Sequence, residues 1–525
     1  MKYAYLSIVF SLFLFKGSLA LGASRVPPEN SARLWVEARG YANFSTCKAS
    51  PNTKGKTIVI SEKMIVNSLT VPVDRSLKFI NKGELDIADG KTVKILGTLE
   101  APLNGIFSGP GKVVFAPGIL KEIYPQWWGA KADGVTDDGR AVMSACETIN
   151  ASGGGTLVFS NGLYLLYKNG TSYRNLANFS NLNGVNIICR GARLLIDPSR
   201  TFNVSYATML LFSNCKNIVI DGFDISGQTP DISKTAVSGI EFVRFVQGCE
   251  NISMPKNKVK GVIAGAIFSR LPSDPDSYIC KNIDIGILDV NNSFYGISCQ
   301  FSGNNMSVRD LITDTVHRSY FIFGVNHHSV RINSKNPYAN DCYLAAFSGK
   351  GCENIRVVYT NTESRSSSVF CNLVSIGWNG ITPAIFKNIY LDVNIVYHPG
   401  RQSGSSGVYI FKYDDNYNPD SQDRGHKLEN LYITGSIHGI PQYIGAFPIH
   451  TLTSCHWGPG DHWNNIRIKN MRLSSSKPML IDLGSVEDSL ILENVTSDSD
   501  IVLAGKPRMG VTYINVTAPN HRGTH

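Results

Sequence analysis

A short phrase recurs along this 525-residue chain at intervals that indicate a solenoid. It consists of a cysteine, a charged residue, an asparagine and an isoleucine, and it opens a strand of alternating pattern. The copies begin at Cys215, Cys249, Cys280 and Cys352, and looser copies begin at Phe386, Leu428 and Trp463. The intervals are 34, 31, 72, 34, 42 and 35 residues. Self-similarity at this period predicts stacked repeats, and the longest interval leaves room for a degenerate coil near Asn305 or His328.

The phrase has a physical interpretation as one corner of a repeating coil. We expect the first residue to point inward, the asparagine to form a turn and bond stacked backbone, and the isoleucine to pack on its equivalent in the next coil. Four of the eleven cysteines share the first position, which predicts an internal column of buried free thiols. A disulfide framework is the alternative. The chain has no Cys-x-x-Cys pair, so we expect no zinc site.

A second feature lies upstream of the repeats, in residues 127–138, which read Trp-Trp-Gly-Ala-Lys-Ala-Asp-Gly-Val-Thr-Asp-Asp. Apolar residues at helical spacing follow, then three glycines (153–155) and a β-rich run. Thr136 or Asp137 can cap a helix start, and an acidic pair suits the positive end of the helix dipole. The pattern predicts a helix at about residues 137–150, followed by a reversal into a strand.

This segment of about forty residues resembles the opening motif of the pectate-lyase-like superfamily, of the pectate lyase 3 type. The resemblance implies an all-β fold, a right-handed single-stranded parallel β-helix with a small N-terminal β-module and a capping helix. It also implies kinship with polygalacturonases and tailspike depolymerases, which act on polysaccharides. We expect a signal peptide at 1–23, the β-module at 24–120, the β-helix at 121–515 and a frayed tail at 516–525.

The N-terminus is typical of a secretory signal. Lys2 precedes an apolar stretch, residues 4–15, and small residues at 18–23 fit a cleavage site. The apolar run is too short to span a bilayer, so we expect a secreted protein without a stable membrane span. The formal charge of +9 suits an acidic partner, although ordinary solubility explains it equally well. No run of basic residues suggests nucleic acid.

Consecutive coils of a β-helix can align outward carboxylates about 5 Å apart per coil, and glycoside hydrolysis needs two carboxyl groups. A lyase would instead need a base, with Arg, Lys or a cation to neutralise a uronate. Residues 314–318 contain three kinds of ionisable side chain, a carboxylate, an imidazole and a guanidinium, and they form the preferred catalytic site. A solvated turn is the alternative for this cluster, and an exposed strand face is the alternative for Glu241. The candidate catalytic residues are Asp314, His317, Asp289, Glu241 and Glu363. The candidate substrate-binding residues are Arg318, Asp341, Asp414, Asp415, Tyr413 and Trp378.

Three further segments, 413–416, 425–426 and 467–469, resemble the ordered cleft motifs of polygalacturonase-type hydrolases. The chain departs from that pattern, because Lys427 stands where the motif has a second glycine and no Asn-Thr-Asp triplet precedes Asp414. The run Arg-Ile-Lys at 467–469 also fits any alternating strand. The pair His327-His328 is expected at a turn rather than as a pair of metal ligands.

The sequence therefore predicts a secreted polysaccharide-processing enzyme that uses outward carboxylates in a β-helix groove, with hydrolysis favoured over elimination. The alternative is a non-catalytic β-helix that binds glycans or serves as a surface-structural protein. We expect a polysaccharide partner, with an acidic one as a candidate, and no metal site or cofactor apart from Ca²⁺ in the case of a lyase. The tailspike resemblance would imply a homotrimer.

Overall fold

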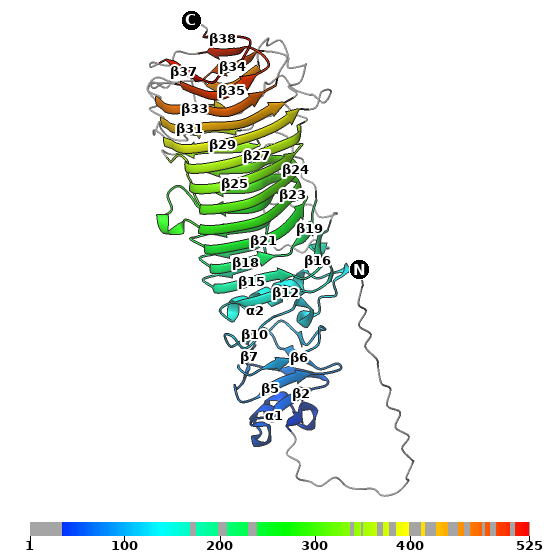
Figure 1. The fold of residues 1–525 in the computed structure, drawn as a ribbon. Helices are drawn as coiled ribbons and strands as arrows, with labels where there is room; N and C mark the ends of the chain where they lie inside the picture. The colour runs from blue at the N-terminus through cyan, green and yellow to red at the C-terminus, as the bar shows by residue number, and fades with distance from the viewer. Residues whose placement is uncertain are drawn as a thin grey trace, which may run out of the picture.

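The structure is a long stack of parallel β-strands (Figure 1). It is a computed structural model that describes residues 34–168, 175–197, 207–228, 239–336, 341–347, 350–364, 371–376, 385–397, 411–414, 427–438, 450–455, 462–474, 478–482, 490–504 and 510–523. The expected signal peptide lies outside these ranges. Within them every strand pairing is parallel, and one sheet follows the chain order from β11 to β38. The expected all-β parallel β-helix is confirmed.

The N-terminal module is itself a small parallel solenoid with three sheets. Its helix α1 (Phe44–Ala49) lies at the start of the module, with short 3-10 turns η1 (Ala38–Gly40) and η2 (Pro51–Thr53). The strands β5 and β6 each alternate half-buried and buried residues, so their apolar side chains fill one interior. The first sheet contains β1 (Trp35–Glu37), β2 (Thr57–Ile60), β5 (Ser76–Phe79) and β8 (Leu99–Glu100). The second contains β3 (Lys63–Val66), β6 (Glu84–Ile87) and β9 (Phe107–Ser108), and the third β4 (Leu69–Val71), β7 (Thr92–Ile95) and β10 (Lys112–Phe115).

The motif at residues 127–138 forms the junction between the module and the long stack. It contains the 3-10 turn η3 (Pro125–Trp128), strand β11 (Asp133–Asp137) and the start of helix α2 (Gly139–Ala151). Asp137 accepts a hydrogen bond from the Gly139 amide at 2.9 Å, as expected of a residue at a helix start. Asp138 has another role: it is buried and accepts hydrogen bonds from the amides of Lys131 and Ala132, at 2.7 and 3.1 Å. Burial raises the pKa of Asp138.

The long stack has three faces, each a ladder of strands from successive coils. The first face contains β12 (Gly155–Phe159), β15 (Asn183–Cys189), β18 (Lys216–Asp221), β21 (Glu250–Lys260), β23 (Lys281–Gln300), β24 (Asn304–Phe323), β25 (Asn326–Lys335), β27 (Glu353–Ser364), β29 (Ile385–Tyr397), β31 (Lys427–His438), β33 (His462–Leu473), β35 (Leu490–Ser497) and β37 (Val511–Ile514). The second face begins with β11 and continues through β13 (Gly162–Leu166), β16 (Ala192–Ile196) and β19 (Asp224–Ser226). Because β19 pairs with residues 258–260 of β21, the second face continues in the later parts of the first-face strands.

The third face runs along the remaining side of each coil. It contains β14 (Asn175–Ser180), β17 (Ala207–Ser213), β20 (Ile240–Val246), β22 (Ala264–Ser269), the last parts of β23 and β24, β26 (Cys342–Phe347), β28 (Cys371–Ile376), β30 (Phe411–Asp414), β32 (His450–Cys455), β34 (Met479–Asp482), β36 (Ile501–Ala504) and β38 (His521–Gly523). Strand β38 pairs in register with β36. Strand pairing thus extends into residues 516–525, the range expected to be a frayed tail.

The interior is filled by columns of like side chains. Phe179, Phe212, Phe245 and Phe268 stack with ring centroids 4.9, 5.3 and 4.9 Å apart. The cysteines of the repeat phrase, at 215, 249, 280 and 352, are all buried and none forms a disulfide, which confirms the expected thiol column. Each coil therefore buries the apolar side of its neighbour, as a solenoid requires.

The asparagines of the repeat form a ladder along one corner. The asparagine ladder contains Asn183, Asn217, Asn251, Asn282 and Asn305, then Asn354, Asn388, Asn430 and Asn465. Each side-chain amide donates to the side-chain oxygen of the asparagine one coil below, so the bonds run between side chains rather than to stacked backbone. From Asn217 onward the ladder residues have positive φ, for example 59° at Asn282, which asparagine tolerates better than most residues.

Two further coils begin within the 72-residue interval, and each is short. Strands β24 and β25 each begin a coil, with Asn305 and His327 at the ladder position. His327 has φ 61°, as the asparagines do, so it replaces an asparagine without a change of backbone. The expectation of an intervening coil was therefore right in kind, but two coils begin within the interval.

Substitution of Asn282 separates the two contributions of a ladder residue. Asn282→Ala loses two hydrogen bonds, of 3.0 and 3.3 Å, and places at positive φ an alanine, which tolerates this backbone region less well than asparagine does. We expect a loss of about 2–3 kcal/mol in unfolding free energy. Asn282→Gly keeps the backbone unstrained and should lose about 1 kcal/mol less. Chemical denaturation followed by circular dichroism measures both, and equal losses would contradict a role for backbone conformation.

Candidate functional site

The outer side of the second face carries rows of charged residues. On β21, Lys256, Lys258 and Lys260 are exposed, and they alternate with the buried Asn257 and Val259 because strand side chains alternate between faces. The neighbouring strands extend the same pattern across the face in register. Lys258 lies opposite Asp289, and Lys260 begins a column that continues through Asn291, Asp314 and Lys335.

Two of the expected catalytic carboxylates meet on this surface. Asp289 on β23 and Asp314 on β24 are half-buried, on adjacent strands and two residues apart in register. A strand spacing of about 4.8 Å and a rise of about 3.3 Å per residue place their Cα atoms roughly 8 Å apart. Asp289 accepts a hydrogen bond from the Asn291 amide at 2.8 Å, and Asp314 accepts one from Asn336 at 2.8 Å. Neither carboxylate forms an ion pair within the described part of the chain.

Basic residues lie on both sides of this acidic pair. Lys256, Lys258 and Lys260 precede it, and Arg331 and Lys335 follow it on β25, all of them exposed. In the residues that the structure describes, none of these five side chains has an ion-pair partner. We call the surface formed by these five basic residues with Asp289, Asn291 and Asp314 the charged strip. It offers cations to an anionic ligand and two carboxylates between them.

His317 and Arg318 lie beyond a turn, on the third face. The turn is at Thr315, whose φ is 56°. The His317 ring is 9% exposed and stacks on Phe294 with centroids 4.3 Å apart. The Arg318 guanidinium lies over the rings of Phe321 and Tyr343, 4.8 and 4.5 Å from their centroids. Both side chains are therefore positioned by aromatic contacts, which hold them next to the strip rather than within it.

Glu241 does not occupy the exposed strand face that its sequence context suggested. Its side chain on β20 is fully buried. It accepts hydrogen bonds from the Arg244 guanidinium and from the Thr208 hydroxyl, each at 2.8 Å. A buried carboxylate satisfied in this way stabilises the coil and has no access to a polysaccharide.

Asp341 was expected to bind substrate, but the structure places it in the interior. It is fully buried and accepts hydrogen bonds from the backbone amide and hydroxyl of Ser319 and, at 2.7 Å, from the Tyr359 hydroxyl. Burial raises the pKa of Asp341. A residue without access to solvent cannot contact a polysaccharide, so its role is to join neighbouring coils.

The remaining expected site residues lie toward the C-terminal half. The backbone of Glu363 belongs to β27, and Tyr413 and Asp414 belong to β30; their side chains, together with Trp378 and Asp415, lie outside the described residues. Strand β30 pairs with β28 and β32, whereas Arg467 and Lys469 lie on β33, which pairs with β31 and β35. The described parts of two of these segments, residues 413–414 and 467–469, thus lie on different faces.

The basic rows of the charged strip were missed by reasoning from the sequence. The spacing of Lys256, Lys258 and Lys260, every second residue after a repeat phrase, was the available signal. A strand with this alternation must place all three lysines on one side. The interpretation of charge as ordinary surface solubility hid this pattern.

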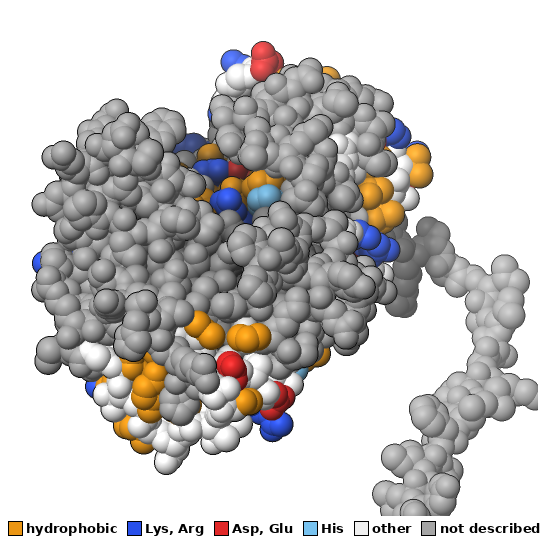
Figure 2. Space-filling view, turned by 90° about the horizontal axis from the view of Figure 1, so that it is seen from above, with side chains coloured by type: hydrophobic (Ala, Val, Ile, Leu, Met, Phe, Trp, Pro, Cys, Tyr) orange, Lys and Arg blue, Asp and Glu red, His pale blue; other side chains and the backbone are white. Residues whose placement is uncertain are grey.

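The rest of the described surface adds charge but no metal centre. Seen from the C-terminal end, basic, acidic and histidine side chains gather in a hollow (Figure 2). Among the described residues, no group of three or more His, Cys, Asp and Glu side chains is arranged to hold a metal ion. In the same ranges no helix is long and apolar enough to cross a membrane.

The likenesses found by comparison with known proteins are structural and remote. No protein-family model and no curated protein matches the chain. Solved structures match over 77% of the chain at 12% identity: PfbA, a surface adhesin of Streptococcus pneumoniae (91% of that chain, TM-score 0.40), and an exopolygalacturonase from Thermotoga maritima (92% of that chain, TM-score 0.35). A mannuronan C-5 epimerase module from Azotobacter vinelandii matches over 76% of the chain and 97% of its own, at 12% identity and a TM-score of 0.29.

Proposed function

We propose that this protein is a secreted polysaccharide-processing enzyme that binds an acidic polysaccharide on the charged strip and hydrolyses it. The observation that carries the proposal is the position of Asp289 and Asp314. Their Cα atoms lie roughly 8 Å apart on one outer face, a backbone spacing from which the two carboxyl groups can reach the separation of about 6.5–9.5 Å that inverting glycosidases use. Unpaired basic side chains on both sides suit the anionic groups of such a substrate.

The chemistry requires one carboxyl group in its acid form and one as a base. The acid donates its proton to the glycosidic oxygen as the bond from that oxygen to the anomeric carbon breaks. The base takes a proton from a water molecule, whose oxygen adds to the opposite side of the anomeric carbon. The separation of the two aspartates leaves room for that water. Lys258, Lys260 and Lys335 would hold the substrate through its carboxylate or sulfate groups.

Hydrolysis is favoured over elimination because the strip places carboxylates, rather than a neutral base, between its cations.

The non-catalytic alternative is favoured by a specific observation. Asp289 and Asp314 each accept hydrogen bonds from neighbouring side chains, Asn291 for the former and Asn336 and Thr315 for the latter. Such bonds also suit carboxylates that order a surface for binding alone.

The test is incubation of the purified mature protein with polygalacturonate, alginate, hyaluronan and a neutral glucan as a control. We expect reducing ends to appear from at least one acidic polymer, without absorbance from unsaturated uronates. Unsaturated products would indicate a lyase and contradict hydrolysis. Binding to an acidic polymer without cleavage would replace the enzyme by the glycan-binding alternative, and the absence of both would contradict the proposal as a whole.

A further inference from the structure

One coil carries an insertion that its neighbours lack. Residues 270–280 connect β22 to β23, whereas the equivalent connections after β17, β20, β23 and β24 span only residues 214–215, 247–249, 301–303 and 324–325. The insertion includes the 3-10 turn η5 (Asp276–Tyr278) and projects from the side of the stack as a green loop (Figure 1). Insertions into a single repeat commonly form loops on the binding face of a solenoid.

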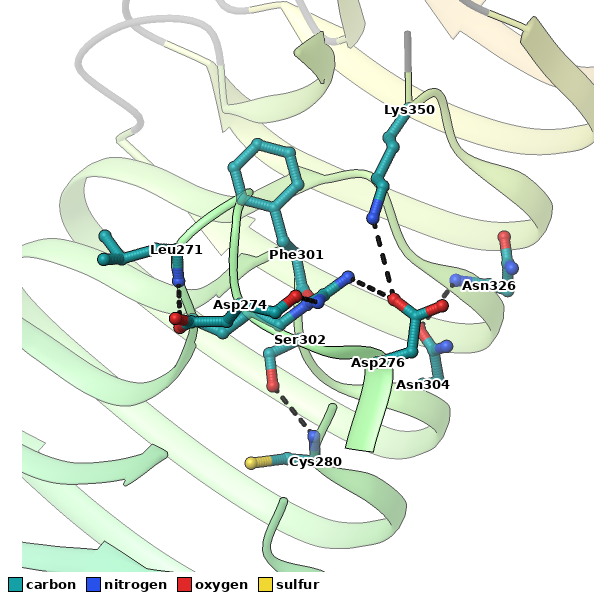
Figure 3. A network of polar contacts seen from close by, with 10 residues as sticks. Leu271, Asp274, Asp276, Cys280, Phe301, Ser302, Asn304, Asn326 and Lys350 are labelled. Atoms are coloured by element: carbon teal, nitrogen blue, oxygen red, sulfur yellow. Dashed lines mark hydrogen bonds and ion pairs between the residues drawn. The ribbon is translucent and has the colours of Figure 1, made fainter. Parts of the chain in front are cut away.

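A buried arginine holds this loop in one shape. The Arg270 side chain is 2% exposed, and its guanidinium donates to the carbonyl oxygens of Phe301 and Asp274 and to Asp276 Oδ1, the last at 2.9 Å. Lys350 approaches the same carboxylate at 3.6 Å. Asp276 is thereby fixed beside Asn304 and Asn326, at the corner of the following coils (Figure 3). A loop fixed in this way is already ordered before any ligand arrives.

The asparagine ladder is interrupted at the same corner. Asn305 donates to Asn282 at 3.3 Å, and Asn354 lies 3.4 Å from the His327 ring. His327 occupies the position where the next asparagine would donate to Asn305. Within the described residues, the side-chain oxygen of Asn305 therefore accepts no hydrogen bond, unlike the equivalent oxygen of Asn282.

A pocket of about 500 Å³ lies between the loop and the interrupted ladder. It is lined by Glu250, Asp276, Ser277, Ile279, Lys281, Asn304, Asn305, Asn326 and His327. Each of its carboxylates already has basic partners: Glu250 pairs with Lys281 and Lys216 at 3.1 and 3.4 Å, and Asp276 with Arg270 and Lys350. The charges in the pocket are thus balanced internally, while amide, hydroxyl and imidazole groups remain to donate and accept.

We infer that this pocket binds an uncharged, hydroxyl-bearing sugar ring. The amide and hydroxyl groups of the pocket can donate to sugar hydroxyls and accept from them, and its paired carboxylates can accept. Among the described residues that line the pocket, no cation is unpaired, which distinguishes it from the charged strip. The inference does not depend on cleavage at the strip. It gives the protein a second glycan site, selective for a neutral unit of the same or another polysaccharide.

The deciding variant is His327→Asn, which restores the ladder. Its backbone φ of 61° already suits asparagine, and the new amide can donate to Asn305. We therefore expect the variant to fold with an unchanged or higher Tm while its pocket loses the free acceptor. The test ligands are four neutral tetrasaccharides of glucose, mannose or galactose: cellotetraose, maltotetraose, mannotetraose and galactotetraose. Titration calorimetry of the mature protein should show binding of at least one of them, with a Kd on the order of 1 mM. His327→Asn should raise that Kd at least about tenfold.

Lys258→Gln is the matched control, because it removes a cation of the charged strip and leaves the pocket intact. It should weaken binding of polygalacturonate or alginate and leave the Kd of the neutral tetrasaccharide unchanged. Loss of acidic-polymer binding at the charged strip and loss of tetrasaccharide binding at the pocket are thus measured separately. The inference is overturned if none of the four tetrasaccharides binds, if His327→Asn binds them as tightly as the wild type, or if calcium chloride alone gives the binding signal.

Discussion

Asp314→Asn and Asp289→Asn are each expected to lower the rate of reducing-end release by about 10²–10⁴-fold, the usual contribution of a general acid or base. Asparagine keeps the size of the side chain and can still accept the hydrogen bond that Asn336 donates to Asp314. The fold and the basic rows of the charged strip should therefore be unaffected. The loss should appear in kcat, while the Kd for the acidic polymer changes little or falls, because one negative charge is removed beside the substrate.

Asp392→Asn is the control for this prediction. Asp392 is half-buried on β29, in register with Val358 and Thr434, two strands beyond Arg331 and further along the stack than Asp289 and Asp314. It should retain wild-type activity. Two carboxylates that act on one bond are not additive, so the double variant at 289 and 314 should be about as slow as the worse single variant. Independent, multiplicative losses would contradict their action as a pair.

Much of the fold could be predicted because the repeat is visible at the level of single residues. Cysteine, asparagine and isoleucine in a fixed order indicate an inward column, a turn and a packed strand, and all three are present at Cys280, Asn282 and Ile283. The number of coils within the 72-residue interval could not be predicted. The copy at β24 has lost its cysteine and the copy at β25 has a histidine in place of the asparagine, so the phrase no longer marks the coil.

The candidate site was harder to predict because the polarity of a residue does not show which way it faces. Asp289 and Asp314 follow the strand alternation and lie on the outside as expected. Glu241 also faces outward, but it pairs with Arg244 and is covered, and Asp341 is inside with Tyr359. Arg244 is only three residues from Glu241, but Thr208, which also bonds Glu241, and Tyr359, which bonds Asp341, lie on other strands, and a sequence pattern does not contain such contacts.

The two adjacent histidines illustrate the same difficulty. One of them leads to the second prediction with a large effect, on the pH dependence of stability. His327 is exposed on the ladder corner, whereas His328 is buried against Tyr320. The Nε2 atom of His328 lies 2.6 Å from the carbonyl oxygen of Gly303, and Nδ1 contacts the Tyr320 hydroxyl. A neutral imidazole satisfies both contacts, with Nε2–H as donor and Nδ1 as acceptor. Protonation would place a charge in the core and turn Nδ1 into a donor.

We expect the protein to lose about 3 kcal/mol of stability through His328 as the pH falls from about 6.5 to about 4. Burial lowers the pKa of His328 from 6.5 to about 4, so in this window the unfolded chain binds a proton that the native chain does not. The contribution is intact above 6.5 and is lost as the pH approaches 4. Asp341 acts in the opposite direction, because burial raises its pKa and the native chain then binds the proton more tightly than the unfolded chain.

Native-state hydrogen exchange in β24 and β25, measured from pH 7 to pH 4 in an Asp341→Asn background, isolates the histidine contribution. His328→Gln should be less stable than its parent at pH 7 but nearly flat across this window, since glutamine can still hydrogen-bond and does not titrate. His327→Asn, one residue away and exposed, should lose stability between pH 7 and pH 4 as its parent does. An acid slope that survives in His328→Gln, or disappears in His327→Asn, would assign the sensitivity to another group.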